Sequence, residues 1–305
     1  LEGGRLRRAA ETVLPSRDYR GLDDTIRAFL AAHSLAVTSA SFGIAGPVKD
    51  GRAEVTNLPW VVDAGELSTA LGIPKVVVIN DLEASAYGIG ELGPEDFATI
   101  HEGAPSAGGN AAVIAAGTGL GEAGLFWDGT RHHAFACEGG HADFAPRNEL
   151  EVDLLRYLLA RWDRVSYERV LSGPGLFNLY TFLRDTGRGE EPSWLRDALA
   201  NGDPSTVVTE VGLRGESELC VAALDLFATL YGAEAGNLAL KLFATGGVYL
   251  GGGIAPKILP KLLAPAFATA FTSKGRMRAL MDAIPVRVVL NGQVALLGAA
   301  RRAAM

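Results

Sequence analysis

The sequence is poor in cysteine, has no excess of basic charge and lacks a long uninterrupted apolar run. Its two cysteines, Cys137 and Cys220, are too few for a disulfide framework, and no C-x-x-C or Cys/His spacing of a zinc site occurs. We therefore expect a cytoplasmic protein. The 28 Lys and Arg residues and 35 Asp and Glu residues give a formal net charge of −7. Because no basic stripe is present, a nucleic-acid partner is disfavoured.

Signals for a membrane, for secretion and for a P-loop are also missing. Apolar stretches such as 243–254 are broken by glycine well short of the ~20 residues that span a bilayer. No charged segment followed by an apolar core opens the chain. No G-x-x-x-x-G-K-S/T motif occurs, which excludes a P-loop fold. We expect no membrane partner.

Glycine, by contrast, is abundant. The chain has 38 glycines in 305 residues, where average usage is about 7%, and they lack the three-residue period of collagen. Tight backbone turns must therefore be numerous. The 48% hydrophobic and 21% charged residues are typical of a soluble globular enzyme, and the length suggests two domains.

Apolar patterning predicts strands that alternate with helices, which indicates an α/β architecture. The all-apolar run 76–79 is typical of a strand covered on both faces of a parallel sheet. The other strands are expected within 1–14, 36–48, 111–116, 122–127, 248–250 and 286–290. Helices are expected at 22–33, 63–71, from 83, at 150–162, 175–185 and 216–243, from 256 and from 293, with exposed loops at 187–191 and 202–206.

Two glycine-rich turns follow apolar strands and are candidate phosphate-binding loops. In Gly117-Thr118-Gly119-Leu120-Gly121, backbone N–H groups and the Thr118 hydroxyl can bind a phosphate, or the segment is a plain hairpin. A dinucleotide-binding fingerprint, with Glu138 as its acidic residue, would need a helix where a strand is expected. Gly251-Gly252-Gly253 ahead of Pro256 suits an anion or nucleoside, or a tight strand-to-helix turn.

Asn80 and Asp81 follow the strand at 76–79 directly. Ligands of open α/β sheets bind outside the carboxyl ends of strands, so a carboxylate here is placed for chemistry. Alternatively, Asp81 only caps the helix that follows.

Two further polar positions are candidate ligands. In Glu138-Gly139-Gly140-His141, a carboxylate and an imidazole with two glycines between them suit a polyhydroxylated ligand. Zinc with Cys137 is the rival interpretation, but it lacks a four-ligand set. Glu168 precedes a turn at Gly173-Pro174-Gly175 and is, on its own, typical of an exposed helical residue.

Five segments taken together carry a family resemblance. They are VINDLEASAYGI (78–89), AAGTGLGEAGL (115–125), CEGGHADFAP (137–146), YERVLSGPGLFNLY (167–180) and GGVYLGGGIAPKIL (246–259). In this order and spacing, nearly the whole chain resembles the bacterial glucokinase family of the sugar kinase, Hsp70 and actin superfamily. The cysteine-rich zinc signature of the ROK family is absent, which favours the zinc-free glucokinase group.

The resemblance implies an α/β, two-domain, actin-like ATPase (ribonuclease H-like) fold with a substrate cleft between the domains. It implies a small domain of residues 1–108 plus 291–305, a large domain of residues 109–290, and a homodimer. The implied reaction is ATP-dependent phosphorylation of D-glucose at the C6 hydroxyl to glucose 6-phosphate, the first step of glycolysis, with Mg²⁺ bound through the nucleotide.

The resemblance also implies the site residues, none of which ligates a metal. Asp81 is the implied general base. The implied sugar ligands are Asn80, Glu138, His141, Glu168 and Asn57, and the implied ATP loops are Gly117, Thr118 and Gly119 together with Gly251, Gly252 and Gly253.

Alternatives remain open. The chain could phosphorylate another hexose, could be a non-catalytic sugar sensor on the same fold, or could be a dinucleotide-dependent dehydrogenase on the evidence of 117–121 alone. The residues do not specify whether ATP, ADP or polyphosphate is the donor. Family members begin with a strand and an Asp-x-Gly-Gly-Thr phosphate loop, which this sequence lacks. We therefore expect a further strand and phosphate loop upstream of Leu1.

Overall fold

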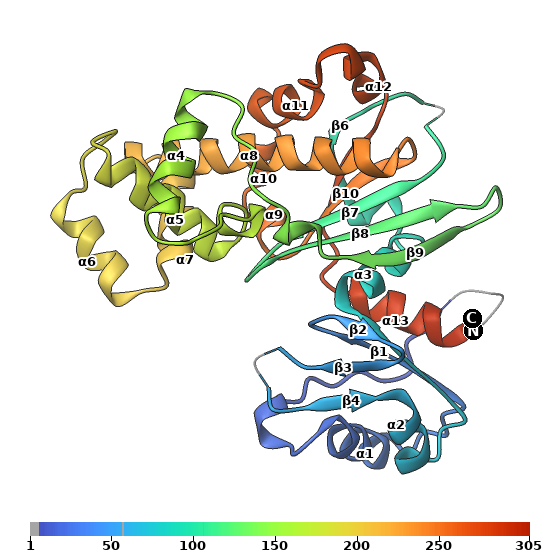
Figure 1. The fold of residues 1–305 in the computed structure, drawn as a ribbon. Helices are drawn as coiled ribbons and strands as arrows, with labels where there is room; N and C mark the ends of the chain where they lie inside the picture. Colours follow the sequence, from blue (N-terminus) through green and yellow to red (C-terminus); the bar gives the residue numbers. More distant parts are fainter. Residues whose placement is uncertain (1–5, 57, 106) are drawn as a thin grey trace. The chain divides into compact units, whose positions relative to one another are not determined.

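The computed structural model describes residues 6–56, 58–105 and 107–305 of a mixed α/β chain (Figure 1). The chain divides into two compact units. The small unit contains Leu1–Pro94, His133–Ala136 and Gln293–Met305, and the large unit contains Glu95–His132 and Cys137–Gly292.

Residues 95–108, which the sequence analysis assigned to the small domain, group with the large unit. The reason is strand β6 (Phe97–His101), which pairs antiparallel with β11 (Val286–Val289) at the edge of the large sheet.

The small unit contains two sheets. One pairs β1 (Ser39–Ile44) with β5 (Lys75–Asn80) in parallel, and the other has the antiparallel order β2 (Val48–Lys49), β3 (Arg52–Glu54), β4 (Val61–Asp63). Its helices are α1 (Leu22–His33), α2 (Ala64–Leu71), α3 (Asp81–Ile89) and α13 (Val294–Ala304), with a 3₁₀ turn at Ser16–Asp18.

Strand β5 is covered on both faces, as its all-apolar sequence predicts. Val78 packs into a cluster with Leu67 of α2, whereas Ile79 packs with Ala84 of α3 and Ala299 of α13. Because successive side chains point to opposite faces of a strand, this two-sided packing fixes the end of β5 and the start of α3.

Helix α13 crosses α3 at two glycines. A Cβ atom on Gly298 would lie 1.7 Å from the carbonyl oxygen of Ala84, and one on Gly88 would lie 2.0 Å from that of Val294. Only glycine allows two backbones to approach this closely. The end of the chain therefore helps to hold the helix that begins at Asp81.

A six-stranded mixed sheet supplies the strands of the large unit, except that His133–Ala136 of its edge strand β9 (His132–Cys137) group with the small unit. The order of this sheet is β6, β11, β10 (Gly247–Gly251), β7 (Ala111–Ala116), β8 (Leu120–Trp127) and β9. Strand β10 pairs in parallel with both β7 and β11, and β8 pairs antiparallel with β7.

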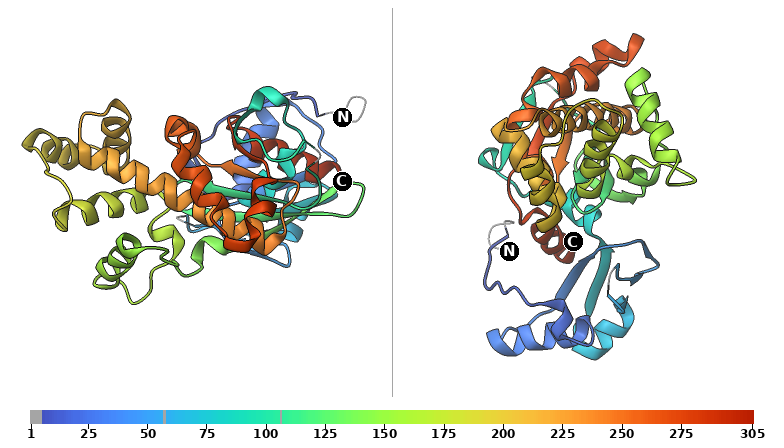
Figure 2. Two further views of the ribbon diagram at one scale, coloured as in Figure 1. Left: turned by 90° about the horizontal axis from the view of Figure 1, so that it is seen from above. Right: turned by 90° about the vertical axis from the view of Figure 1, so that its left-hand side faces the viewer.

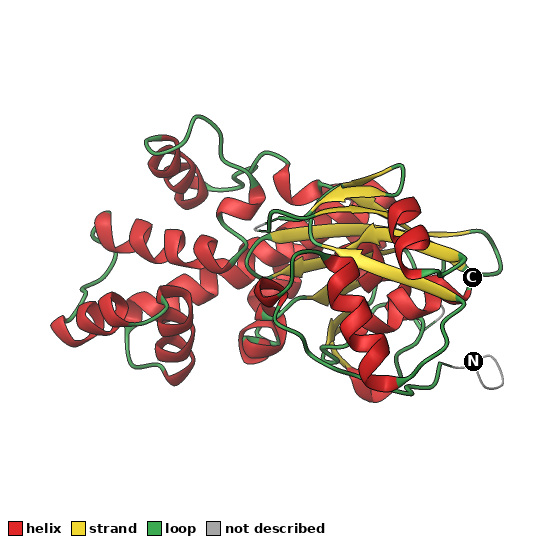
Figure 3. Ribbon diagram, turned by 90° about the horizontal axis from the view of Figure 1, so that it is seen from below, coloured by secondary structure: helices red, strands yellow, loops and turns green. Residues whose placement is uncertain are grey.

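Helices cover this sheet and extend beyond it. Helix α8 (Glu218–Leu242) begins in a helical lobe beyond the strands, and its later part packs against β7 (Figures 1 and 2). The lobe contains α4 (Glu149–Leu159), α5 (Gly173–Asp185), α6 (Ser193–Asn201) and α7 (Pro204–Arg214) (Figure 1), and Figure 3 shows it as helices without strands. The other helices are α9 (Ile254–Lys257), α10 (Leu259–Leu262), α11 (Pro265–Thr272) and α12 (Arg278–Asp282), and 3₁₀ turns lie at Pro94–Asp96, Gly139–His141, Tyr167–Arg169 and Gly275–Met277.

Among the described residues, α8 is the one helix long and apolar enough to cross a membrane. Its apolar stretch is 78% buried inside the structure, which is typical of the core helix of a globular protein. The aromatic side chains of Phe227 and Tyr231 are fully buried along it.

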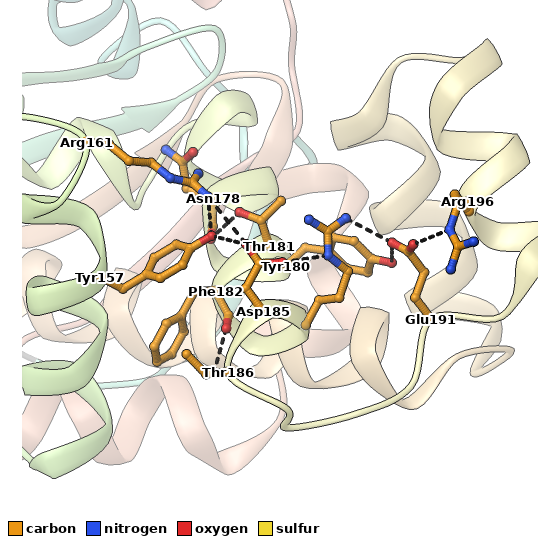
Figure 4. Close-up of polar contacts among 11 residues, drawn as sticks. Tyr157, Arg161, Asn178, Tyr180, Thr181, Phe182, Asp185, Thr186, Glu191 and Arg196 are labelled. Atoms are coloured by element: carbon orange, nitrogen blue, oxygen red, sulfur yellow. Dashed lines mark hydrogen bonds and ion pairs between the residues drawn. The ribbon is translucent and has the colours of Figure 1, made fainter.

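Within the lobe, a buried carboxylate ties α5 to the segment before α6 (Figure 4). Glu191, whose side chain is 7% exposed, accepts hydrogen bonds from the Tyr180 hydroxyl at 2.8 Å, Arg184 Nη1 at 3.1 Å and Arg196 Nε at 3.0 Å. Burial opposes ionisation of Glu191, but these three donors outweigh it and lower its pKa.

We expect Glu191→Gln to lower the free energy of unfolding by about 1–3 kcal/mol at pH 7, because charge-assisted hydrogen bonds are lost. Since folding lowers the pKa of Glu191, its contribution is present above the ordinary glutamate pKa and is lost as the pH falls through the folded pKa. Thermal unfolding followed by circular dichroism at pH 7 and at pH 3.5 measures this. Glu190→Gln, at the exposed neighbour, is the control. A Tm difference between parent and Glu191→Gln that is the same at both pH values would contradict the assignment.

Most expected elements are present, but two expectations are wrong. The strand expected within 1–14 is absent from residues 6–14, which pair with no described strand, and residues 1–5 lie outside the described residues. The expected loop at 202–206 contains the start of α7: Asp203 accepts a hydrogen bond from the Thr206 N–H, and Pro204 is the first helical residue.

Candidate active site

In the small unit, Asn80 caps the helix that Asp81 begins. The buried Asn80 side chain accepts hydrogen bonds from Leu82 N at 2.8 Å and Glu83 N at 3.3 Å, and its Nδ2 donates to the Gly46 carbonyl at 3.0 Å. The interpretation of Asp81 as the cap is therefore wrong, because Asp81 is the first helical residue. Its half-buried carboxylate accepts from Leu82 N at 2.9 Å.

The end of β1 lies beside this point. Ile44 is in parallel register with Asn80, so the Gly46 turn and Asp81 leave the same edge of the sheet. The Thr56 N–H donates to the Ala45 carbonyl at 3.1 Å, which places that segment against the Gly46 turn. Asn57, a predicted sugar ligand, lies outside the described residues.

In the large unit, the two glycine-rich turns leave neighbouring parallel strands at the same edge. Gly117–Gly119 joins β7 to β8 and is closed by a hydrogen bond from Gly117 N to the Gly119 carbonyl at 2.8 Å. Gly251 is in register with Ala115. Gly252 has φ +79°, and a Cβ atom there would lie 2.3 Å from the Ala116 carbonyl. A strand follows Gly119, where a dinucleotide-binding fingerprint would require a helix.

Helix α5 begins beside the first of these turns. Gly173 N donates to the Gly117 carbonyl at 2.8 Å, and the Ser172 hydroxyl caps the helix by accepting from Gly175 N at 3.0 Å. Backbone N–H groups of a tight turn next to a helix N-terminus provide an environment that favours phosphate oxygens.

The turn from Glu138 to His141 packs tightly on β8. A Cβ atom on Gly140 would lie 2.0 Å from the Leu120 carbonyl oxygen, so the backbone contacts the strand directly. The flanking Glu138 and His141 side chains are 57% and 56% exposed, with 3.9 Å between Glu138 Oε2 and His141 Nε2. Both polar groups are therefore available to a ligand in the described chain.

Glu168 is held against the same strand residue. Its Oε2 accepts a hydrogen bond from Leu120 N at 3.1 Å, while the Leu120 carbonyl lies under Gly140. The neighbouring backbones are also joined, because Tyr167 N donates to the Ala142 carbonyl at 2.9 Å. Glu168 is thus half-buried beside the strand residue that the Glu138–His141 turn packs on, unlike the exposed helical residue that its sequence alone suggests.

Two contributors were not expected from the sequence. Leu120 reads as an ordinary strand residue, yet its N–H and carbonyl organise Glu168 and Gly140. Arg164 donates to the His141 carbonyl at 2.6 Å and to Asp143 at 2.8 Å, and nothing in its local sequence marks it. Among residues 6–56, 58–105 and 107–305, no group of three or more His, Cys, Asp or Glu side chains could hold a metal ion.

The family model described as Glucokinase matches residues 2–305 of this chain. The chain belongs to the glucokinase family. Members of this family are ATP-dependent hexose kinases, and this glucokinase-family chain is 44% identical to the glucokinase of Nostoc sp. over 96% of the chain and 90% of the relative. It is 39% identical to the glucokinase of Hahella chejuensis over 94% of the chain and 87% of the relative.

Solved structures agree with the fold. A glucokinase from an Antarctic psychrotroph matches with a TM-score of 0.83 and 31% identity, covering 95% of this chain and 88% of the other. A ROK family glucokinase from Streptomyces griseus, solved with glucose and AMPPNP, matches with a TM-score of 0.61 and 23% identity over 93% and 87% of the two chains. The glucokinase-family chain therefore has the two-domain, actin-like α/β fold that the resemblance implies.

Proposed function

We propose that this chain transfers the γ-phosphoryl group of ATP to the C6 hydroxyl of D-glucose, with Asp81 as the general base. The observation that carries the proposal is the arrangement around Leu120, which gathers Glu138, His141 and Glu168 beside the Gly117–Gly119 turn. Acceptor ligands and phosphate-binding groups are the two parts that a sugar kinase needs.

Asp81 suits the role of base because it follows a strand that is packed on both faces. A carboxylate held within hydrogen-bond distance of the acceptor hydroxyl takes its proton as the oxygen attacks phosphorus in line. Asn80 is proposed to bind the sugar next to it, with Asn57 as a further ligand. The Asn80 side chain already donates to Gly46 and accepts from α3, so its orientation is fixed before the sugar arrives.

The glycine turns are proposed to bind the nucleotide. Gly117, Thr118 and Gly119 would donate to phosphate oxygens, and Gly251, Gly252 and Gly253 would line the adenosine. Phosphoryl transfer depends mainly on positioning and charge stabilisation, and Mg²⁺ carried by the β- and γ-phosphates would supply positive charge there.

Glucose is proposed in preference to other hexoses because the site offers several polar groups to hydroxyls. A sugar that lacks a contacted hydroxyl would leave buried polar groups unpaired, and such mismatches are rejected strongly. The glucokinase of Balamuthia mandrillaris was solved with glucose, which supports the same choice. We further propose that the chain is a cytoplasmic homodimer.

A panel of acceptors and donors tests the proposed function. We expect formation of glucose 6-phosphate from ATP and glucose, with kcat/KM for mannose, fructose and N-acetylglucosamine at least about tenfold lower. The readout is phosphosugar detected by mass spectrometry, with ADP and polyphosphate as alternative donors. Sugar binding by calorimetry without phosphosugar formation would instead identify a sensor. A preferred hexose other than glucose would overturn the acceptor assignment.

A further inference from the structure

One buried carboxylate of β8 lies beneath the turn from Glu138 to His141. Glu122 is 1% exposed. A Cβ atom on Gly139 would lie 1.7 Å from Glu122 Oε2 and 3.3 Å from Glu122 Cβ, so the carboxyl group occupies the space that a side chain at position 139 would need. The turn therefore rests on the Glu122 carboxyl at Gly139 and on the Leu120 carbonyl at Gly140.

A second buried carboxylate, Glu234 of α8, interacts with Glu122. Glu234 is fully buried, accepts a hydrogen bond from Asn237 Nδ2 at 2.7 Å and lies 3.4 Å from Lys241 Nζ. Glu122 Oε1, by contrast, has no hydrogen-bond partner among the described residues. The Lys241 cation lowers the pKa of Glu122, but burial and the Glu234 charge raise it more strongly, so ionising both buried carboxylates is unfavourable.

The other titratable groups around Glu122 come from α8 and from the turn itself. Tyr231 of α8 is fully buried, and burial and the Glu122 charge both raise its pKa. Burial also raises the pKa of Cys137, and the charges of Glu122 and Glu138 raise it further. Tyr231 and Cys137 therefore keep their protons at neutral pH, and the acidic group whose charge raises the pKa of Glu122 is Glu234.

The pKa of Glu122 itself is raised to about 8, first by burial and then by Glu234, against the attraction of Lys241. One contact further away, Lys274 Nζ donates to Asn237 Oδ1 at 2.5 Å, and burial lowers the pKa of Lys274 to about 8. At neutral pH, Glu122 is therefore the uncharged acid, and it ionises under mildly alkaline conditions.

We propose that Glu122 is a positioning residue for the acceptor sugar: its uncharged carboxyl group holds Gly139, and through it Glu138 and His141, in the sugar-binding arrangement. Ionisation places a second negative charge beside Glu234 and below Glu138. That charge is better accommodated if water enters between the strand and the turn, which displaces Gly139. This inference rests on the proposed function, because it assumes that Glu138 and His141 bind the sugar.

The first test compares the pH dependence of glucose KM in the parent and in Glu122→Gln, which has the shape of the uncharged acid. With a pKa near 8, the fraction of the protein in which Glu122 is uncharged falls to about a tenth at pH 9. The parent KM for glucose should therefore rise about tenfold between pH 7 and pH 9. In Glu122→Gln the glucose KM should change by less than about twofold between pH 7 and pH 9. Any remaining pH dependence would come from titration of Lys274. Glu218→Gln, at an exposed position, should keep the parent profile.

The second test is a double-mutant cycle on the contact itself. Gly139→Ala should raise the glucose KM about tenfold, because the new Cβ meets the Glu122 carboxyl. In the double variant with Glu122→Ala, that carboxyl is gone and the nearest Glu122 atom left is its Cβ at 3.3 Å. The KM should therefore return to within about threefold of Glu122→Ala alone. Gly140→Ala is the matched control, because its clash is with the Leu120 carbonyl and Glu122→Ala cannot relieve it.

Either of two results overturns the inference: the same pH profile in the parent and Glu122→Gln, or additive effects of Gly139→Ala and Glu122→Ala. Circular dichroism confirms that each variant is folded, and the isosteric Glu122→Gln keeps the test valid if Glu122→Ala does not fold. The proposed sugar site fails separately, if Glu138→Gln leaves the glucose KM unchanged. If Glu138→Gln raises the KM but Glu122→Gln keeps the parent profile, only the present inference fails.

Discussion

Replacing Asp81 by Asn should lower kcat for glucose phosphorylation by a factor of about 10²–10⁴, the range that general-base catalysis contributes. The asparagine amide cannot take the proton that the attacking sugar hydroxyl must lose. Its oxygen can still accept the hydrogen bond from Leu82 N that Asp81 makes in the parent, and Asn80 still caps α3. We therefore expect the glucose dissociation constant, measured by calorimetry, to change by less than about threefold, which separates a chemical role from a structural one.

Asp197→Asn is the matched control for this variant, because Asp197 is exposed on α6 and has no proposed role. It should keep the parent kcat. A kcat of Asp81→Asn within threefold of the parent would show that another group takes the proton.

The second large effect is expected at Glu168, where alanine and glutamine separate two roles. Glu168→Ala removes a charged sugar ligand and the acceptor of the Leu120 N–H, so the glucose KM should rise about 100-fold, which corresponds to the upper range for a hydrogen bond to a charged group. Glu168→Gln keeps an oxygen that can accept from Leu120 N and should raise the KM about tenfold.

The ATP KM distinguishes these variants further. Leu120 directly follows the Gly117–Gly119 turn, and Glu168 Oε2 lies 2.5 Å from where a Cβ atom on Gly119 would be. Loss of the Leu120 hydrogen bond in Glu168→Ala should therefore raise the ATP KM several-fold, whereas Glu168→Gln should leave it near the parent value. Equal glucose KM values for the two variants would contradict the positioning of Leu120 by Glu168.

The local sequence predicts those helices and strands whose apolar pattern lies entirely within their own residues. The helix at 22–33 and the strand at 111–116 have the expected bounds, because one has a continuous apolar face and the other an unbroken apolar run ended by glycine. The start of α7 is not predicted by the local sequence. Asp203 and Pro204 are helix-start signals, but the glycine and polar residues beside them favour a loop.

Some residues of the candidate site are recognisable from local motifs and others are not. Motifs in which polar residues lie beside glycines, which leave room for a ligand, identify Asn80, Asp81, Glu138, His141, Glu168 and the two glycine turns. Their roles remain proposals. Glu122 carried no such signal, since a single Glu in an apolar strand is equally compatible with exposure at a sheet edge.

The family, the alternation of strands and helices and the candidate ligands can be identified from the sequence, because these depend on residue type and spacing along the chain. The role of Asn80 rather than Asp81 as the cap of α3 is visible only in the fold. Tertiary structure also placed Leu120 between Glu168 and Gly140, and buried Glu122 beneath Gly139 and beside Glu234. These contacts join residues up to about a hundred positions apart, and their distances and burial set the charge state of Glu122, which no local pattern encodes.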